Sequence, residues 1–565
     1  MRYELKLMDT LSGAGCFAAF PGPNLSFSEV LEHLEAHPFD EYMHRHMLDM
    51  LGKHRTRKVQ KLIGEVKGNP DKKVLAALLY EAVLTHPRLE SLRAEVENSF
   101  DAAELKEYSP TLHLRSHLQT DQPLHNSWTS IFADNIEMHT ELPLPGETGA
   151  TALYAKDELP AKTAVTAAEI KSGLEAENKL PPAKPRSPIE LVTSNANRKL
   201  ESIGAFMGPQ MRQKGCLSPF AVLHHWMVEN RTSNGALSNS LRAIQTSYGR
   251  GLTFEQACVS CAMEVVERVS SYADIGKSGV MGRTEDLPVI KGTYEEISAK
   301  GSALNPAQLS LEVPYEGQPL WWMPSEMFDG AAHVPSMLPV QHIFLFCNLD
   351  EQSLFSGLSS TGLASGNTMA EARLSALLEV LERDSDSTIP FDMDRCFTVE
   401  TDDPAISKHL ADLESCGIKV WFQDTTSEFG IPCYKAFAIG KHGDVNKGGG
   451  CSLNAKRALI SALTEVPYPF PGPPTSELPQ GLPVRSLESL PDFSTGSAEG
   501  DLMVLEQTLA ANGFYPHYAN LTRKDLQIPV TRAVVPGLEI VTDFDKFSRV
   551  SKRLYRNYLD IKNLL

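Results

Sequence analysis

The chain lacks any long hydrophobic run. No apolar stretch approaches the roughly 18 residues that a membrane-spanning helix requires. The first residues, MRYELKLMDTLSG, also lack the hydrophobic region of a secretory signal peptide. We therefore expect no membrane-spanning helix and no membrane partner, and the cytoplasm is the expected location.

The chain has fewer basic than acidic residues. The 565 residues include 53 Lys and Arg against 71 Asp and Glu, which gives a formal net charge of −18 at pH 7. Proteins that bind nucleic acid usually carry a basic surface, so this balance argues against a nucleic-acid partner. The hydrophobic share of 42% and the charged share of 22% are ordinary for a globular protein. The length allows two or three domains.

Cysteines are few and irregularly spaced. The nine cysteines are odd in number and scattered, which suits a reducing compartment. Cys258 and Cys261 form a Cys-x-x-Cys pair, but no second pair stands at zinc spacing. We therefore interpret these cysteines as structural thiols rather than as metal ligands or a redox pair.

Two stretches of the chain repeat one pattern. Residues 251–270 read GLTFEQACVSCAMEVVERVS, and residues 366–385 read GNTMAEARLSALLEVLERDS. Both contain a Gly, a Thr two places later, an Ala and then Ser-x-x-x-Glu-x-x-Glu-Arg. An internal repeat of this kind constrains the whole fold. The shared residues are Ser260, Glu264, Glu267 and Arg268 in the first copy and Ser375, Glu379, Glu382 and Arg383 in the second.

Each copy is predicted to be an amphipathic helix. Thr253 with Gln256, and Thr368 with Glu371, have the spacing of a capping box at a helix start. At about 100° per residue, offsets of four, seven and eight from the Ser fall on one face, so the Ser, both Glu and the Arg lie together. The opposite face is apolar in both copies and is expected to lie in a core.

The shared polar face indicates a ligand site. Two carboxylates three residues apart repel each other unless a cation lies between them, and Mg²⁺ prefers such oxygen ligands. Glycine-containing turns before both helices offer N–H groups to phosphate, with Arg250 before the first helix and Asn367 before the second. The pattern predicts a two-fold cradle for a metal–phosphate ligand, with four carboxylates converging. The alternative is a solvated face with weak ion pairs, which a single copy would indicate.

At these residues the sequence resembles the YcaO family. The resemblance covers roughly residues 195–550 and includes SSTGLASGNT at 359–368, the Gly430-Ile-Pro turn and Val535-Pro-Gly-Leu-Glu539. It implies an α/β fold of the YcaO type, with pseudo-two-fold repeated halves around a nucleotide site. Strands are expected at 339–348, 418–423 and 433–439, where apolar or β-branched runs stand between turn signals.

The resemblance also implies a reaction, with ATP and Mg²⁺ as cofactors. Family members phosphorylate the oxygen of a peptide backbone amide and let a nucleophile replace it. A Cys, Ser or Thr side chain then gives an azoline, sulfide a thioamide and an amine an amidine. The catalytic residue is not identified. By resemblance, Mg²⁺ would be held by Glu264, Glu267, Glu379 and Glu382, and the nucleotide by Arg250, Ser260, Arg268, Asn367, Ser375 and Arg383.

The chain departs from the family pattern in two places. A third motif should follow the helix at 455–465, with Gln at Tyr468 and Arg at Gly472, but a proline-rich run stops that helix. The helix itself repeats Ser-x-x-x-Glu, as Ser461 and Glu465. Ring-forming members often end in a proline-rich tail, whereas this chain ends DIKNLL. We therefore disfavour azoline formation and leave the nucleophile open.

The chain is divided here into three predicted parts. These are a mainly helical N-terminal module at 1–140, a Pro/Ala-rich extended linker at 141–192 and a YcaO domain at 193–565. The expected partners are a peptide or protein substrate and a protein for leader-peptide binding or sulfur delivery, with a homodimer left open. Two alternatives remain: an accessory factor for another protein's sulfur modification, of the methylthiotransferase accessory type, and a nucleotide-binding scaffold without turnover.

Overall fold

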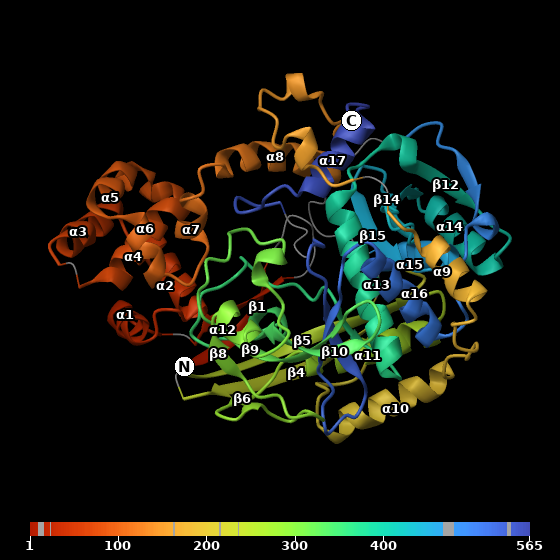
Figure 1. Cartoon of the computed structure of the whole chain (residues 1–565), viewed down its shortest axis with the longest axis horizontal. Helices are drawn as coiled ribbons and strands as arrows, with labels where there is room; N and C mark the ends of the chain where they lie inside the picture. The colour runs from red at the N-terminus through yellow and green to blue at the C-terminus, as the bar shows by residue number, and fades with distance from the viewer. Residues whose placement is uncertain are drawn as a thin grey trace.

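The computed structural model describes residues 1–8, 16–22, 24–69, 71–161, 164–213, 216–235, 237–466, 479–539 and 544–565. Within these residues the chain forms three β-sheets covered by helices (Figure 1). This confirms the predicted α/β class. None of the described helices is long and apolar enough to span a membrane.

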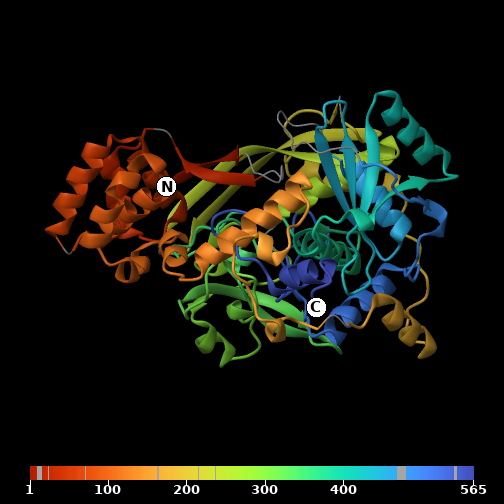
Figure 2. The same cartoon turned by 90° about the horizontal axis from the view of Figure 1, so that it is seen from above.

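The N-terminal part is a compact group of helices at one end of the molecule (Figure 2). Helix α4 lies at its centre, since nearly all of its side chains are buried, including Leu78 and Leu79. The helices of the group are α1 (Phe27–Ala36), α2 (Glu41–Lys53), α3 (Thr56–Lys67), α4 (Lys73–Thr85), α5 (Arg93–Ser99), α6 (Ala102–Leu105) and α7 (His113–His117). Helix α8 (Gln122–Met138) follows them in the chain and leads away from the group (Figure 1).

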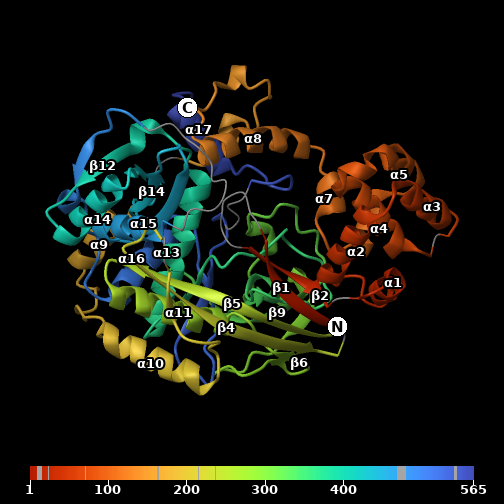
Figure 3. The same ribbon diagram turned by 180° about the vertical axis from the view of Figure 1, so that it is seen from behind.

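Two strands precede these helices, which the sequence did not predict. Strand β1 (Arg2–Met8) pairs with β2 (Cys16–Pro21) and also lies parallel to β5, with Tyr3 opposite Leu241. Figure 3 shows both strands beside the long hairpin of the first sheet. The start of the chain therefore belongs to a sheet of the larger part of the molecule, while the predicted domain boundaries stay a prediction.

The first sheet has the order β2-β1-β5-β4-β6-β7, with β3 on the outer side of β4. Strands β4 and β5 form a long antiparallel hairpin, and α11 packs on both of them. Helix α10 packs in turn on α11. The bounds are β3 (Met211–Arg212), β4 (Phe220–Ser233), β5 (Ser238–Gly251), β6 (Ile275–Gly276), β7 (Gly279–Val280), α10 (Ile189–Ser202) and α11 (Phe254–Ser270).

The second sheet has the order β10-β9-β17-β18-β11, with β8 on β9. Helix α13 packs on β11 and β18 and against α16. The bounds are β8 (Ile290–Gly292), α12 (Tyr294–Ser298), β9 (Leu320–Phe328), β10 (His333–Pro339), β11 (Leu363–Ser365), α13 (Met369–Thr388), α16 (Ala498–Ala511), β17 (His517–Asn520) and β18 (Val530–Val534).

The prediction of a strand at 339–348 is wrong. Strand β10 ends at Pro339, and a short 3-10 helix and turns follow. Ile343, Phe344 and Phe346 are nevertheless almost fully buried in the core. A continuous apolar run does not reveal its conformation by periodicity, because every residue in it is buried whatever shape the chain takes.

The third sheet has the order β15-β14-β13-β12-β16, and α15 packs on β14 and β15. The strands predicted at 418–423 and 433–439 match β13 and β14 in this sheet. The bounds are β12 (Cys396–Glu400), α14 (Pro404–Ser415), β13 (Lys419–Asp424), β14 (Cys433–Ile439), β15 (Val445–Cys451), α15 (Ala455–Glu465) and β16 (Val484–Ser486).

The predicted linker and the end of the chain lie against this body. Helix α9 (Ala167–Ala176) packs on α16, and the N–H of Ala167 donates to the carbonyl of Phe429 at 2.9 Å. Helix α17 (Lys552–Ile561) packs on α13 and joins α8 in one aromatic cluster, in which the rings of Trp128 and Tyr555 are 5.0 Å apart. The described part of residues 141–192 is therefore held to the surface rather than hanging free.

Candidate nucleotide site

Three strand–glycine–helix units surround the candidate site. In each unit a strand runs into a helix: β5 into α11, β11 into α13 and β15 into α15. A methyl group on Gly249, Gly366 or Gly450 would lie 2.0, 2.4 or 2.1 Å from the backbone of the helix that follows. Only glycine permits so close a packing of strand and helix. The two predicted helices therefore have a third counterpart with the same local construction.

The three units contact one another in a cycle. Helix α11 packs on β11, α13 on β15, and α15 on β5. Ser365 on β11 donates to the carbonyl of Met263 on α11 at 2.8 Å. A methyl group on Gly449 of β15 would lie 2.7 Å from the carboxylate of Glu382 on α13. Each of the three helices thus packs on the strand of another unit. The pseudo-two-fold relation of two halves stays a prediction.

The first copy of the motif holds its charges within α11. Nη1 of Arg268 lies 3.0 Å from Oε1 of Glu267, and Nε lies 3.6 Å from Oε1 of Glu264. Glu264 also accepts a hydrogen bond from the N–H of Tyr248 at 3.2 Å. Burial raises the pKa of Glu267 to about 8, and the charge of Glu379 adds to this shift. The pKa of Glu264 is raised as well, again chiefly by burial.

The ion pairs of the second copy reach residues outside the motif. Nη2 of Arg383 lies 3.6 Å from Oε1 of Glu382, and Nη1 lies 4.0 Å from Asp386, which in turn pairs with Lys435 on β14 at 3.3 Å. Burial raises the pKa of Glu382 to about 7 and also raises the pKa of Glu379. All four repeated glutamates are partly buried and costly to ionise.

The glutamates of the two copies face a common centre. The charge of Glu379 acts on Glu267, and the charge of Glu465 on α15 acts on both Glu264 and Glu382. We call these five carboxylates the carboxylate ring. Among the residues that the structure describes, no three His, Cys, Asp or Glu side chains lie close enough to hold a metal ion together. The described residues of the ring are therefore not a preassembled metal centre.

Guanidinium groups stand between the carboxylates. Nη1 of Arg250 donates to the carbonyl and the carboxylate of Glu465, both at 3.2 Å. Arg532 on β18 is 3% exposed, feels both Glu379 and Glu267, and donates through Nη2 to the carbonyl of Ser359 at 2.9 Å. Burial lowers the pKa of Arg532 to about 10. The two copies thus share one buried cation that neither motif contains.

Several of these guanidinium groups carry N–H donors that make no hydrogen bond with the described residues. Nε of Arg250, and Nε and Nη1 of Arg532, are buried without a hydrogen-bond partner among the described residues. Buried N–H groups are nearly always paired in folded proteins, so these atoms are suited to an anion that brings its own acceptors. Phosphate is such an anion, and the neighbouring carboxylates are the ligands that Mg²⁺ prefers. The residues present therefore fit a magnesium–nucleotide ligand.

The remaining predicted residues lie at the rim. Ser260 and Ser375 are exposed, one turn before Glu264 and Glu379 on their helices. Asn367 is exposed at the start of α13, where its Nδ2 and N–H both donate to Glu371. Their predicted contacts with the nucleotide stay predictions.

The sequence missed three residues that border the ring: Arg532, Asp386 and Lys435. Arg532 could have been noticed as a single charge inside the apolar run PVTRAVV. Lys435 likewise interrupts an apolar strand. Tyr468 and Gly472, the altered positions of the third motif, lie outside the described residues.

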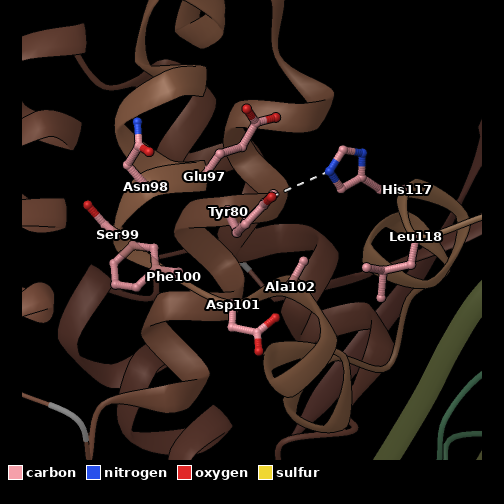
Figure 4. Close-up of a pocket in the computed structure, with 9 residues that line it drawn as sticks. All are labelled: Tyr80, Glu97, Asn98, Ser99, Phe100, Asp101, Ala102, His117 and Leu118. Carbon is pink, nitrogen blue, oxygen red and sulfur yellow. Dashed lines mark hydrogen bonds between the residues drawn. The ribbon is translucent and has the colours of Figure 1, made fainter.

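A surface hollow lies elsewhere in the molecule. It is an open hollow of about 600 Å³ in the N-terminal helices (Figure 4). There the hydroxyl of Tyr80 lies 3.4 Å from Nε2 of His117. None of its lining residues belongs to the three units, so we place the functional site at the carboxylate ring, where the charges and unpartnered donors gather.

Comparison with known proteins identifies the family. The model of the family described as YcaO cyclodehydratase, ATP- and Mg²⁺-binding, matches residues 248–467. These residues therefore match the YcaO family model, which confirms the predicted resemblance and the family's cofactors, ATP and Mg²⁺. The match spans both copies of the motif and the third unit.

Individual relatives are more distant. An uncharacterized protein of Methanothermobacter thermautotrophicus is 29% identical over 335 residues, which are 53% of this chain and 82% of the relative. A heterocyclase in complex with substrate and cofactor has a TM-score of 0.52 at 18% identity, over 70% of this chain and 59% of its own. The YcaO protein of Methanopyrus kandleri, bound with AMPPCP and Mg²⁺, has a TM-score of 0.46 at 20% identity, over 65% of this chain and 94% of its own. At 18% identity, the likeness to the heterocyclase shows the fold alone.

Proposed function

We propose that this chain binds Mg²⁺-ATP at the carboxylate ring and uses it to activate a peptide backbone amide. A nucleophile then replaces the amide oxygen and leaves a thioamide, an amidine or an azoline. The observation that carries this proposal is the set of buried, unpartnered guanidinium N–H groups beside carboxylates with raised pKa values. Such a pairing of donors and carboxylates suits a polyanion that arrives with its own divalent cation.

Each group of residues has a distinct role in this proposal. Glu264, Glu267, Glu379 and Glu382 would hold Mg²⁺, and the cations of the ring would bind the phosphates. Bound ATP would supply a phosphoryl group that turns the amide oxygen into a leaving group. Catalysis of phosphoryl transfer consists mainly of positioning and charge neutralisation, so the fixed guanidinium of Arg532 matters more than a general base.

The N-terminal helices contact the part of the chain that precedes the second copy of the motif. They bind the segment at 348–356, which leads into the second copy of the motif. Asn348 donates to Asp40 at 2.9 Å, and Arg115 donates to the carbonyl of Ser353 at 2.6 Å. These contacts support a docking role for the helices, toward a peptide substrate or a partner protein for leader-peptide binding or sulfur delivery. A cytoplasmic location and a homodimer remain further parts of the hypothesis.

A nucleotide-binding scaffold without turnover is the second candidate. It is favoured by one observation: the third motif has Tyr468 and Gly472 where the family pattern has Gln and Arg. An accessory role in another protein's sulfur modification would use the same nucleotide site. Turnover with a peptide distinguishes the enzyme from both.

An isotope experiment tests the proposed reaction. A library of unmodified peptides with oxygen-18 in the backbone amides is incubated with the protein, Mg²⁺-ATP and either sulfide or ammonia. We expect ADP and oxygen-18-labelled phosphate in amounts equal to the modified peptide, and neither product with Glu379→Gln. Phosphate without label would show hydrolysis of ATP by water, and the proposed activation would be wrong. Glu255→Gln, an exposed glutamate in the first turn of α11, is the matched control.

A further inference from the structure

Two cysteines that are far apart in the sequence face each other beside the carboxylate ring. Cys433 on β14 lies directly opposite Cys451 on the antiparallel strand β15. The N–H of Ser452 donates to the carbonyl of Pro432 at 3.1 Å, so that neighbouring pair is a hydrogen-bonded one. Because the two kinds of pair alternate along an antiparallel ladder, Cys433 and Cys451 form a non-hydrogen-bonded pair.

This position suits a disulfide. Cα atoms of a non-hydrogen-bonded pair are about 4.5 Å apart, within the range of roughly 4.4 to 6.8 Å found for disulfides. Because the two residues are directly opposite in the ladder, their side chains lie side by side on one face of the sheet. Both are free thiols in the structure. Cys433 is 2% exposed, but Cys451 is only partly buried, so a small oxidant can reach it.

The pair borders the proposed metal ligands. Side chains alternate along a strand, so Cys451 lies on the same face of β15 as Gly449, two residues away. A methyl group on Gly449 would lie 2.7 Å from the carboxylate of Glu382, so β15 passes close to this glutamate. Strand β15 is the edge of its sheet and packs on α13. A change in how β15 is tied to β14 therefore acts directly on Glu382.

We propose that Cys433 and Cys451 form a reversible disulfide that weakens binding of Mg²⁺-ATP at the carboxylate ring. The effect on binding rests on the proposed function. The oxidant is a small-molecule disulfide. The Cys451 thiolate attacks it and releases one thiol, and Cys433 then attacks the mixed disulfide and releases the second. The two cysteines lose two electrons and two protons, and the oxidant becomes two thiols.

The effect on the site follows from bond length. A disulfide brings the sulfur atoms to about 2.05 Å, far closer than two thiols in contact. Closing the disulfide shifts β15 relative to α13, on which it packs. Gly449 has no spare room against Glu382, so the carboxylate is displaced from the ring. Reduction restores the open arrangement.

The test combines peptide mass spectrometry with calorimetry on the full chain. The protein is equilibrated overnight with oxidised glutathione or with dithiothreitol, and Mg²⁺-ATP affinity is measured in both states. We expect a 433–451 cross-linked peptide and an affinity lowered about tenfold, a coupling typical of linked sites, which dithiothreitol reverses. Under oxidant, Cys433→Ser and Cys451→Ser should each keep the higher affinity that the wild type has in dithiothreitol.

Cys416→Ser is the matched control, since Cys416 is exposed at the end of α14 and should leave the response as in the wild type. Absence of the cross-linked peptide, or a full cross-link with unchanged affinity, would overturn the inference. If the reduced wild type binds no Mg²⁺-ATP, the proposed function fails and the inferred effect on binding fails with it, while the mass spectrum still decides separately whether the disulfide forms. Thermal unfolding of each reduced variant establishes that it is folded.

Discussion

The first copy of the repeated motif, on α11, balances its charges from within. Arg268 forms ion pairs with both glutamates of its own helix, Glu264 and Glu267. The second copy, on α13, does not. Arg383 pairs with Glu382 at 3.6 Å and reaches Asp386 at 4.0 Å. The same sequence pattern thus gives one arginine that pairs with both glutamates of its own copy and one that pairs with a single glutamate and reaches beyond the motif.

The neighbours of the second copy come from other parts of the chain. Lys435 of β14 pairs with Asp386, and Arg553 of α17 donates to the fully buried Asp384 at 2.5 Å. Glu539 also donates its N–H to Asp384 at 2.9 Å. A local motif therefore specifies the helix and its polar face, whereas the tertiary structure decides which charges complete it. Four predictions test this difference between the two copies.

The largest effect is expected at Arg532, which serves both copies. Arg532→Met removes two buried, unpartnered N–H groups from the ring. We expect Mg²⁺-ATP affinity to fall about a hundredfold, since hydrogen bonds to charged groups contribute roughly 1.5 to 3 kcal/mol. Calorimetry measures the affinity, and Arg523→Met, on the loop before β18, is the control. A loss below threefold would mean that the two copies do not share this cation.

The second prediction compares how much Arg268 and Arg383, the arginines of the two copies, contribute to stability. Arg268→Met leaves two partly buried glutamates without their cation, so we expect the free energy of unfolding to fall by about 2 kcal/mol. Arg383 has a side chain 39% exposed, and Arg383→Met should cost less than about 1 kcal/mol. Urea unfolding of both variants without nucleotide measures the difference. Equal losses would contradict the contrast drawn between the copies.

The third effect is a release of protons. The folded-state pKa values of about 8 for Glu267 and about 7 for Glu382 lie above the ordinary value of 4.5. Without metal, these groups make folding less favourable as the pH rises from 4.5 toward 8, because the unfolded chain loses its protons first. Metal binding requires the carboxylates to be deprotonated, so Mg²⁺-ATP should bind more tightly as the pH rises through this range.

Calorimetry in buffers of different ionisation enthalpy counts these protons. We expect about one proton to be released near pH 7.5, mostly from the first copy, because Glu267 has the higher pKa. Glu267→Gln should therefore reduce the release more than Glu382→Gln does. Binding without proton release would show that these carboxylates are already ionised or do not meet the metal.

The smallest effect is expected at Lys435. Lys435→Met removes the external cation of the second copy but leaves Arg383 in place, so affinity for Mg²⁺-ATP should fall only about fivefold. Lys419→Met, in the adjacent strand of the same sheet, is the control because Lys419 pairs with Glu414 at the surface. If both variants bind as the wild type does, Lys435 takes no part in the site.

The sequence predicts the local structure of the site well. Thr253 and Gln256 form the expected capping box, and α11 begins as predicted. Thr368 caps α13, but Glu371 turns to Asn367 instead of completing the box. These features depend on residues a few positions apart, so a single sequence contains their full signal. The family resemblance rests on the same local patterns.

Long-range features could not be predicted in the same way. Arg532 reaches the ring because β18 pairs with β11, and Cys433 meets Cys451 through a strand register that no periodicity reveals. Strand β1 joins the first sheet from the other end of the chain. The pairing of distant strands depends on the packing of the whole molecule, and a local pattern carries little information about it.

The most direct test is calorimetric titration of the full chain with Mg²⁺-ATP, with Glu264→Gln and Glu379→Gln beside the wild type. The central claim is that two copies of one motif form one site. It predicts one nucleotide bound per chain and loss of that binding in either variant. Two nucleotides per chain, or unchanged binding in both variants, would contradict it.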